Sequence, residues 1–190
     1  MPGSVFRVLF VCEGNICRSP SAELLLRNGL GADTGVAVAS AGLAARVGEP
    51  VDEPVRRLLA ARGLDADVVA QQLVSDLVRS ADVVLTMTAA QRAAVVSRVP
   101  AAVRRTFVLR EFAALARLAG PLAATDPTGR IAALVEGAGR TRALRGPLGD
   151  DDVPDPYRRG DEAHARALEL IKGAVDDLLA VVAPTAVHAR

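Results

Sequence analysis

Apolar runs and helical repeats alternate along this chain, and each apolar run is short enough to be a single strand. Four runs predict buried strands, at Val5 to Val11, Val36 to Ala41, Asp82 to Met87 and Thr106 to Leu109. Apolar residues at helical spacing predict helices at Arg18 to Gly29, Asp52 to Arg62, from Ser75, Thr88 to Arg98 and Arg159 to Val182. The chain is therefore predicted to alternate between strands and helices.

This alternation is typical of a parallel sheet with helices on both faces, because parallel strands need a crossover between them. The sequence predicts an α/β fold, a three-layer sandwich around a four-stranded parallel sheet with right-handed crossovers. We expect residues 1–190 to form a single domain, with a helix-bearing surface excursion near residues 117–149. Ligands of such sheets bind at the carboxyl ends of the strands, so the segment after the first strand is of special interest.

That segment carries a cysteine and an arginine separated by five residues. A helix N-terminus and a nearby cation both favour the thiolate of Cys12, which is the nucleophilic form of the side chain. The N–H groups of residues 13–18 can curl around an anion, and Gly14 permits the tight backbone that this needs. Arg18 can hold two phosphate oxygens, and Ser19 can donate a hydrogen bond to sulfur. These parts suit attack on phosphorus, with a phosphocysteine formed and then hydrolysed.

The cysteines and histidines have other interpretations. Taken alone, Cys12 at the end of an apolar strand is also consistent with a small buried apolar residue. The strand–loop–helix context favours a nucleophile instead. Cys17 is either the partner of Cys12 in a reversible protective disulfide or a small residue packed in the loop. His164 and His188 lack metal-ligand spacing and are expected at the surface. We therefore expect no metal and no other cofactor.

The composition narrows the class of protein. Hydrophobic residues make up 51% of the 190 residues, which is typical of a globular chain. The net charge of +1 gives no reason to expect nucleic acid as a partner. No apolar run is long enough for membrane insertion, and two cysteines do not make a secreted disulfide framework. A cytoplasmic enzyme is the expectation.

The loop also carries a family resemblance. Together with the following Ser21-Ala22-Glu23, the stretch Val11 to Pro20 resembles the phosphate-binding loop of the low-molecular-weight protein tyrosine phosphatases, bacterial type. The similarity continues, in the family's order, in Ala39-Ser40-Ala41-Gly42, in the stretch Ala81 to Thr88 and in Asp155-Pro156-Tyr157. The resemblance implies a single phosphatase-like domain that hydrolyses phosphotyrosine in proteins.

It also implies roles for individual residues. The catalytic residues would be Cys12 as nucleophile, Arg18 as phosphate clamp and Asp155 as general acid, then general base. The flanking prolines restrict the backbone around Asp155. The alternative for Asp155 is a position in a solvated acidic turn. It is preceded by Asp150, Asp151 and Asp152, which are expected to be turn residues. The substrate-binding residues would be Glu13, Gly14, Asn15, Ile16, Cys17, Ser19, Ser40 and Tyr157.

Two of these residues have simpler alternatives. The resemblance implies that Asn15 stabilises the loop through a contact with Ser40. Without the resemblance, Ser40 is equally well explained as a turn residue at the end of a strand. Tyr157, the chain's one tyrosine, is expected to form a wall for an aromatic ring, or else to cap the sheet edge.

The chain departs from its relatives at the rim of the expected site. Arg158 follows Tyr157 where many relatives have a second aromatic residue, and the loop Leu43 to Val47 has no aromatic residue. A rim that is less aromatic and more basic puts the preference for phosphotyrosine in question, or shifts it toward acidic peptides. Phosphoarginine phosphatases are a further alternative, but relatives with that activity carry threonine where this chain has Ile16, and an apolar side chain better suits an aromatic ring.

Two other functions remain as alternatives. An arsenate-reductase-like thiol enzyme shares the loop, but it needs further cysteines downstream, and this chain has only Cys12 and Cys17. A phosphate-binding regulator without activity is less consistent with the presence of Cys12, Arg18 and Asp155 together. The expected partner is a tyrosine-phosphorylated protein, with a bacterial tyrosine kinase as a candidate by analogy.

Overall fold

The fold is built on one parallel sheet. We describe residues 5–120, 122–145 and 150–183 of a computed structural model of the chain. Within them, four strands pair in the order β2-β1-β3-β4, and all three pairings are parallel. The strands are β1 (Phe6–Cys12), β2 (Val36–Gly42), β3 (Val83–Thr86) and β4 (Thr106–Val108). The predicted four-stranded α/β fold is confirmed, and each strand begins and ends within one residue of its prediction.

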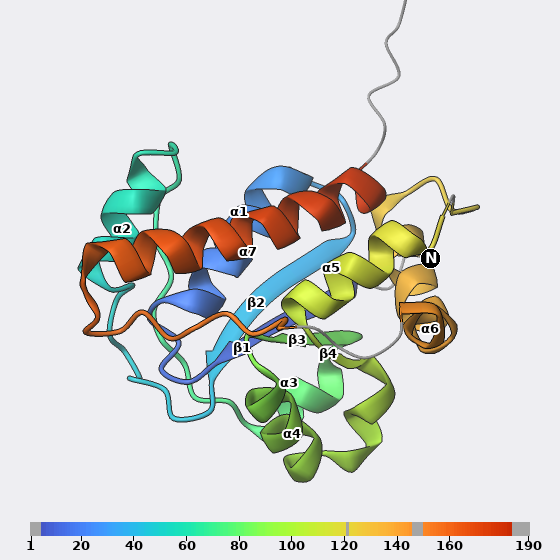
Figure 1. Cartoon of the computed structure of the whole chain (residues 1–190), viewed down its shortest axis with the longest axis horizontal. Helices are drawn as coiled ribbons and strands as arrows, with labels where there is room; N and C mark the ends of the chain where they lie inside the picture. The colour runs from blue at the N-terminus through green and yellow to red at the C-terminus, as the bar shows by residue number, and fades with distance from the viewer. Residues whose placement is uncertain (1–4, 121, 146–149, 184–190) are drawn as a thin grey trace, which may run out of the picture.

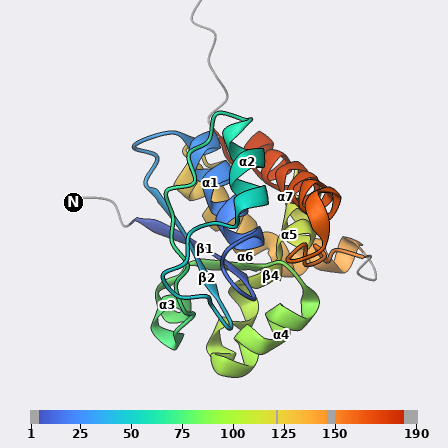
Figure 2. The ribbon, with the colours of Figure 1, turned by 90° about the vertical axis from the view of Figure 1, so that its left-hand side faces the viewer.

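Helices cover both faces of this sheet (Figures 1 and 2). On one face lie α1 (Arg18–Leu30), α5 (Leu109–Leu118), α6 (Pro127–Arg145) and α7 (Gly160–Val182). The other face carries α3 (Ser75–Ser80) and α4 (Ala89–Arg98), followed by a 3-10 helix at Pro100–Arg105. The short helix α2 (Glu53–Ala60) packs beside α7. No helix among the described residues has both the length and the apolar character needed to span a bilayer.

The alternation of side chains along β1 decides which face receives the cysteine. Val8, Phe10 and Cys12 belong to the larger core cluster, together with side chains of α1, α5, α6 and α7. Leu9 and Val11 belong to a second cluster, formed with α3 and α4. Because side chains in a strand alternate between faces, Cys12 points to the same face as Phe10, toward α1.

Helix boundaries follow local signals where these are strong. Thr88 caps α4 as predicted, since its Oγ1 accepts a hydrogen bond from the Gln91 N–H at 3.2 Å. Helix α5 is absent from the sequence-based prediction, although its buried residues Leu109, Phe112, Ala113 and Ala116 have helical spacing. The sequence-based prediction continued the fourth strand through Leu109. In the structure β4 ends at Val108, and Leu109 is already the first residue of α5.

The segment predicted to be a surface excursion contains α6. Its side chains Ile131, Leu134 and Ala138 are buried in the larger core cluster. Residues 121 and 146–149 of the segment lie outside the described residues. The single-domain organisation of residues 1–190, with an excursion near 117–149, stays a prediction.

Candidate active site

The loop after β1 turns sharply around the sulfur of Cys12. Asn15 has φ +56°, in the left-handed region that an asparagine tolerates better than most residues, and its N–H lies 3.3 Å from Cys12 Sγ. The loop also lies against the end of β2, where a Cβ on Gly42 would come within 2.5 Å of the Glu13 carbonyl oxygen. The close approach therefore requires glycine at residue 42.

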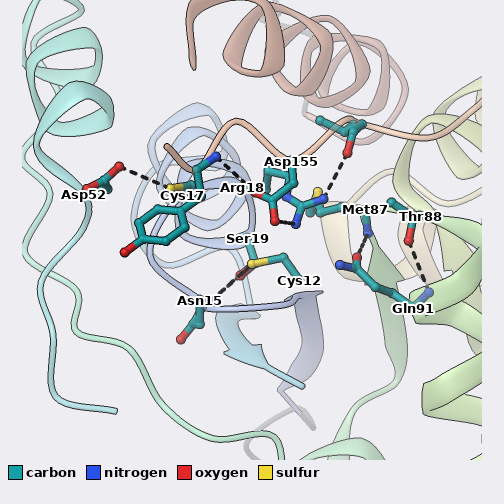
Figure 3. A network of polar contacts seen from close by, with 12 residues as sticks. Cys12, Asn15, Cys17, Arg18, Ser19, Asp52, Met87, Thr88, Gln91 and Asp155 are labelled. Carbon is teal, nitrogen blue, oxygen red and sulfur yellow. Dashed lines mark hydrogen bonds and ion pairs between the residues drawn. The ribbon is translucent and has the colours of Figure 1, made fainter. Parts of the chain in front are cut away.

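A chain of hydrogen bonds sets the orientation of the Ser19 hydroxyl. The Asn15 amide Nδ2 donates to Ser19 Oγ at 2.9 Å and to Ser40 Oγ at 2.8 Å. Ser19 Oγ lies 3.0 Å from Cys12 Sγ (Figure 3). Since Ser19 already accepts from Asn15, its own proton is free to point at the sulfur. The arrangement suits a sulfur atom that carries negative charge.

The same chain continues into the interior through residues without a predicted role. Ser40 Oγ donates to Glu23 Oε2 at 2.7 Å, and the Gln71 N–H donates to Asn15 Oδ1 at 2.9 Å. Burial raises the pKa of Glu23 above its usual value, while the Ser40 hydrogen bond and the nearby Arg27 oppose that rise. Glu23 lies in the stretch Ser21-Ala22-Glu23 that carries the family resemblance, but nothing in its spacing indicated this contact.

Arg18 is held almost entirely out of solvent, at 4% exposure. Its Nη1 donates to the Val153 carbonyl oxygen at 3.1 Å, and its Nη2 lies 2.8 Å from Asp155 Oδ2 (Figure 3). The remaining nitrogen, Nε, is buried and has no hydrogen-bond acceptor among the described residues. A buried, unpaired guanidinium N–H is costly, and an anionic oxygen is the acceptor that suits it best.

The segment that carries Asp155 is fastened to the sheet and to two helices. The Val153 N–H donates to the Met87 carbonyl oxygen at 2.8 Å, just after β3. Arg110 Nη1 donates to the Asp150 carbonyl oxygen at 2.7 Å. Asp152 Oδ1 accepts from the Ala89 N–H at the start of α4, at 2.8 Å, so the expectation of a merely solvated turn residue is wrong for Asp152. These contacts hold Asp155 beside Arg18.

A cavity of about 180 Å³ joins the two segments. It is lined by Cys12, Glu13, Gly14, Ile16, Cys17, Arg18, Ala44, Arg46, Asp155 and Tyr157. Eight of the eleven predicted site residues therefore share one cavity, whereas Asn15, Ser19 and Ser40 line no part of it and brace the loop through the hydrogen bonds above. Ala44 and Arg46 are lining residues that the prediction did not include.

Two cations lie close to the ring of Tyr157, which lines this cavity. The Arg46 guanidinium carbon is 5.4 Å from the centre of the ring, and that of Arg158 is 5.1 Å away. Arg46 also pairs with Glu49, with Nε 2.7 Å from Oε2. Cations at these distances from the ring stabilise its position, so the less aromatic, more basic rim expected from the sequence is present.

One histidine lies elsewhere than predicted. His164 is only 3% exposed, so the expectation of a surface residue is wrong for it, whereas His188 lies outside the described residues. The His164 Nε2 lies 3.2 Å from Asp52 Oδ2, and Cys17 Sγ lies 3.7 Å from the same oxygen. Burial, followed by the Asp52 carboxylate, raises the pKa of the Cys17 thiol well above its usual value. The two cysteines are both free thiols.

The fold and this loop define a class of protein. Residues 7–136 match the family model of the low molecular weight phosphotyrosine protein phosphatases, and the chain belongs to that family. It is 35% identical over 170 residues to a probable low molecular weight protein-tyrosine-phosphatase, EpsP, of Ralstonia nicotianae, covering 89% of this chain and 90% of that protein. It is 34% identical over 182 residues to the low molecular weight protein-tyrosine-phosphatase of Streptomyces coelicolor, covering 93% of each.

Solved structures agree with this assignment. The YwlE arginine phosphatase from Geobacillus stearothermophilus superimposes with a TM-score of 0.69 and 28% identity, over 92% of this chain and 91% of that one. Relatives with two different named substrates thus share the fold, and the fold alone does not choose between them.

Proposed function

We propose that this protein hydrolyses phosphotyrosine in proteins through a phosphocysteine intermediate. The observation that carries the proposal is the buried, unpaired Nε of Arg18 beside the cavity that Cys12 and Asp155 also line. A phosphate group in that cavity supplies the acceptor that Arg18 lacks, and it lies between a nucleophile and an acid. Metal or organic cofactors have no part in the proposed reaction.

In the first step, the Cys12 thiolate attacks phosphorus and forms a sulfur–phosphorus bond. The bond between phosphorus and the tyrosyl oxygen breaks, and protonated Asp155 transfers its proton to that oxygen as it leaves. Arg18 and the loop N–H groups bind the three other phosphoryl oxygens, on which negative charge is spread. The product tyrosine then departs.

In the second step, water hydrolyses the phosphocysteine. The Asp155 carboxylate takes a proton from water, whose oxygen attacks phosphorus while the phosphorus–sulfur bond breaks. Sulfur leaves as a thiolate, which the Ser19 hydroxyl at 3.0 Å stabilises by donating its proton in a hydrogen bond. Inorganic phosphate is released, and both catalytic side chains return to their starting states.

The walls of the cavity support phosphotyrosine as the substrate. Ile16 and the Tyr157 ring both line it, and they offer apolar surfaces on which a phenyl ring can pack. Two relatives, matched over 90% and 93% of their own length, carry protein-tyrosine-phosphatase names. The basic pair Arg46 and Arg158 on the Tyr157 ring supports a preference for acidic residues near the phosphotyrosine.

Phosphoarginine is the second candidate, because a structural relative is named an arginine phosphatase. The apolar Ile16 side chain in the cavity is the observation against it, since a guanidinium group needs hydrogen-bond acceptors. Arsenate reduction is a weaker candidate, because the sequence holds two cysteines and both lie in the loop.

One substrate panel distinguishes these candidates. Phosphotyrosine, phosphoserine and phosphoarginine versions of one peptide are compared, with thiol-dependent arsenate reduction measured beside them. We expect the phosphotyrosine peptide to have the highest kcat/KM, and mass spectrometry of rapidly denatured enzyme to find a phosphoryl group on the peptide that contains Cys12. Cys12→Ser should lose turnover and keep its fold. Faster hydrolysis of phosphoarginine would replace the proposed substrate but not the mechanism.

The chemistry of the nucleophile also bears on the location and partner that we propose. A thiolate nucleophile works where thiols stay reduced, so we propose a cytoplasmic location. The proposed partner is a tyrosine-phosphorylated protein, with a bacterial tyrosine kinase as a candidate. In either case the peptide around the phosphotyrosine has to reach the rim formed by Arg46 and Tyr157.

A further inference from the structure

A second cluster of reactive side chains lies where three helices begin. Cys17 immediately precedes α1, Asp52 immediately precedes α2 and His164 lies in the first turns of α7. Cys17 Sγ and His164 Nε2 lie 3.7 Å and 3.2 Å from Asp52 Oδ2, and the three atoms lie within 4.8 Å of one another. Cys17 and His164 are buried, and Asp52 is partly exposed, which leaves a path to solvent.

The hydrogen bonds of His164 fix which nitrogen is protonated. Its Nδ1 lies 2.8 Å from the Gly160 carbonyl oxygen, which can only accept, so Nδ1 carries a proton. In the neutral ring, Nε2 then presents a lone pair to the lone pairs of Asp52 Oδ2. Two lone pairs at 3.2 Å repel unless a proton or a metal cation lies between them. A histidine held through Nδ1–H by a backbone carbonyl is the usual arrangement of a metal ligand.

Asp52 behaves differently from other aspartates at the start of a helix. Such an aspartate normally accepts a hydrogen bond from an N–H in the first turn. Asp52 occupies the N-cap position of α2, but its side chain makes no such bond. Its carboxylate instead turns toward Cys17, as Figure 3 shows, and toward His164. The Asp52 carboxylate therefore contacts Cys17 and His164 in place of capping the N-terminus of α2.

The geometry points to a zinc-binding site formed by Cys17, Asp52 and His164. Bond lengths of about 2.0–2.3 Å to oxygen, nitrogen and sulfur separate the ligands of a tetrahedral zinc ion by roughly 3.3–3.6 Å. The distances from Asp52 Oδ2 to Cys17 Sγ and to His164 Nε2, 3.7 Å and 3.2 Å, lie close to that range. A thiolate, an imidazole and one carboxylate select zinc over magnesium or calcium.

Binding has a simple proton balance. The Cys17 thiol gives its proton to solvent as the sulfur–zinc bond forms, and the His164 Nε2 lone pair and Asp52 Oδ2 complete three ligands. Water takes the fourth position from the exposed side of Asp52. The bound ion would lie next to the phosphate loop, because Cys17 also lines the active-site cavity. The inference does not depend on which phosphate ester the enzyme hydrolyses.

The test uses cobalt(II) as a coloured probe and zinc as its competitor. The untagged protein carries Cys12→Ser, so that the nucleophile cannot ligate the probe. We expect one cobalt ion per chain, the strong visible absorption of tetrahedral cobalt, a thiolate-to-cobalt charge-transfer band, and displacement of all of these by zinc. His164→Gln should weaken binding by at least about 100-fold, because a ligand matters no less than the groups that orient it.

Further variants separate a site from general thiol binding. Cys17→Ser should remove the charge-transfer band, and Asp52→Asn should weaken cobalt binding while keeping the shape of the side chain. The matched control is His188→Gln, at the chain's other histidine, and it should bind as tightly as the parent. Circular dichroism selects the variants that fold. The site is refuted if cobalt binds without a thiolate band, or if a folded His164 or Asp52 variant binds as tightly as the parent; His164 would then form only an ion pair with Asp52.

Discussion

Nη2 of Arg18 lies 2.8 Å from Oδ2 of Asp155, which joins the expected phosphate clamp directly to the expected acid. The two residues are far apart in sequence, and the carboxylate is 44% exposed while the arginine is buried. A phosphate group that enters the cavity competes with Asp155 for the same guanidinium. On the proposed function, we expect this ion pair to hold Arg18 in position without substrate and to be replaced by contacts with phosphate when substrate binds.

Replacement of Arg18 by lysine tests the geometric part of this role. Arg18→Lys keeps the positive charge but loses the planar fork, so we expect kcat to fall by about 10²–10³-fold, the range for loss of one transition-state donor. Steady-state kinetics with a phosphotyrosine peptide measure the effect. Arg56→Lys, at an exposed arginine of α2, is the control and should leave kcat unchanged. A fall of less than threefold for Arg18→Lys would mean that charge alone is sufficient.

Asp155→Asn tests the proposed acid. The variant cannot protonate a leaving oxygen, so hydrolysis of a poor leaving group such as a tyrosyl or alkyl oxygen should slow by about 10²–10⁴-fold. An ester with a good leaving group departs without a proton and should be affected far less. The slope of log(kcat/KM) against leaving-group acidity should therefore become steeper.

The choice of control for Asp155 depends on the structure. Asp152 accepts a hydrogen bond from Ala89, so its substitution would disturb the segment. Asp150 is exposed and uses its backbone carbonyl oxygen to bind Arg110, which makes Asp150→Asn the matched change. If Asp150→Asn and Asp155→Asn slow the poor leaving groups equally, the acid lies at another residue.

Ile16→Thr tests the preference for an aromatic ring. Ile16 is buried against the cavity, and threonine would replace an apolar surface by a hydroxyl that can accept from a guanidinium. We expect the ratio of kcat/KM for phosphotyrosine over phosphoarginine peptides to fall by about 10-fold or more. The ratio is independent of the amount of folded protein, so a loss of stability does not affect it. An unchanged ratio would show that residue 16 does not select the substrate.

Glu23 makes stability depend on pH in a defined direction. Its pKa is raised by burial above the usual 4.5, so the folded protein holds the proton more tightly than the unfolded chain. That stabilisation is complete below about pH 4.5 and is lost as pH rises through the higher folded-state pKa. The variant Glu23→Gln removes this term. Its free energy of unfolding relative to the parent should therefore increase as pH rises through this window.

Urea unfolding at several pH values measures this difference. The control is Glu162→Gln, at an exposed glutamate of α7, which should show no such trend. A difference between Glu23→Gln and the parent that stays constant with pH would contradict the prediction, because the carboxyl group would then have the same proton affinity in both states.

The sequence by itself determined the alternation of strands and helices and the loop that carries Cys12 and Arg18. Both are local: a strand repeats every two residues, a helix every 3.6, and the loop is complete within a few positions. Helix α5 belongs with these features, since Phe112, Ala113 and Ala116 carry its periodic signal even though the prediction assigned Leu109 to a strand.

Tertiary structure alone decided how distant residues meet at the loop. The pairing of β1 with β2, in which Phe10 is level with Ser40, brings Ser40 within reach of Asn15. The anchoring of Val153 to Met87 carries Asp155 to Arg18. No period in the sequence encodes these approaches, because they depend on how whole elements pack.

The cluster of Cys17, Asp52 and His164 is the clearest example of contacts that the sequence pattern does not predict. His164 looks like an ordinary helical residue in the sequence, and 112 positions separate it from Asp52. Packing of α2 against α7 buries the imidazole and places its Nε2 opposite the carboxylate, with Cys17 on the same oxygen. Sequence spacing reports which residues share a face of one element, whereas contacts between elements arise only when the core has formed.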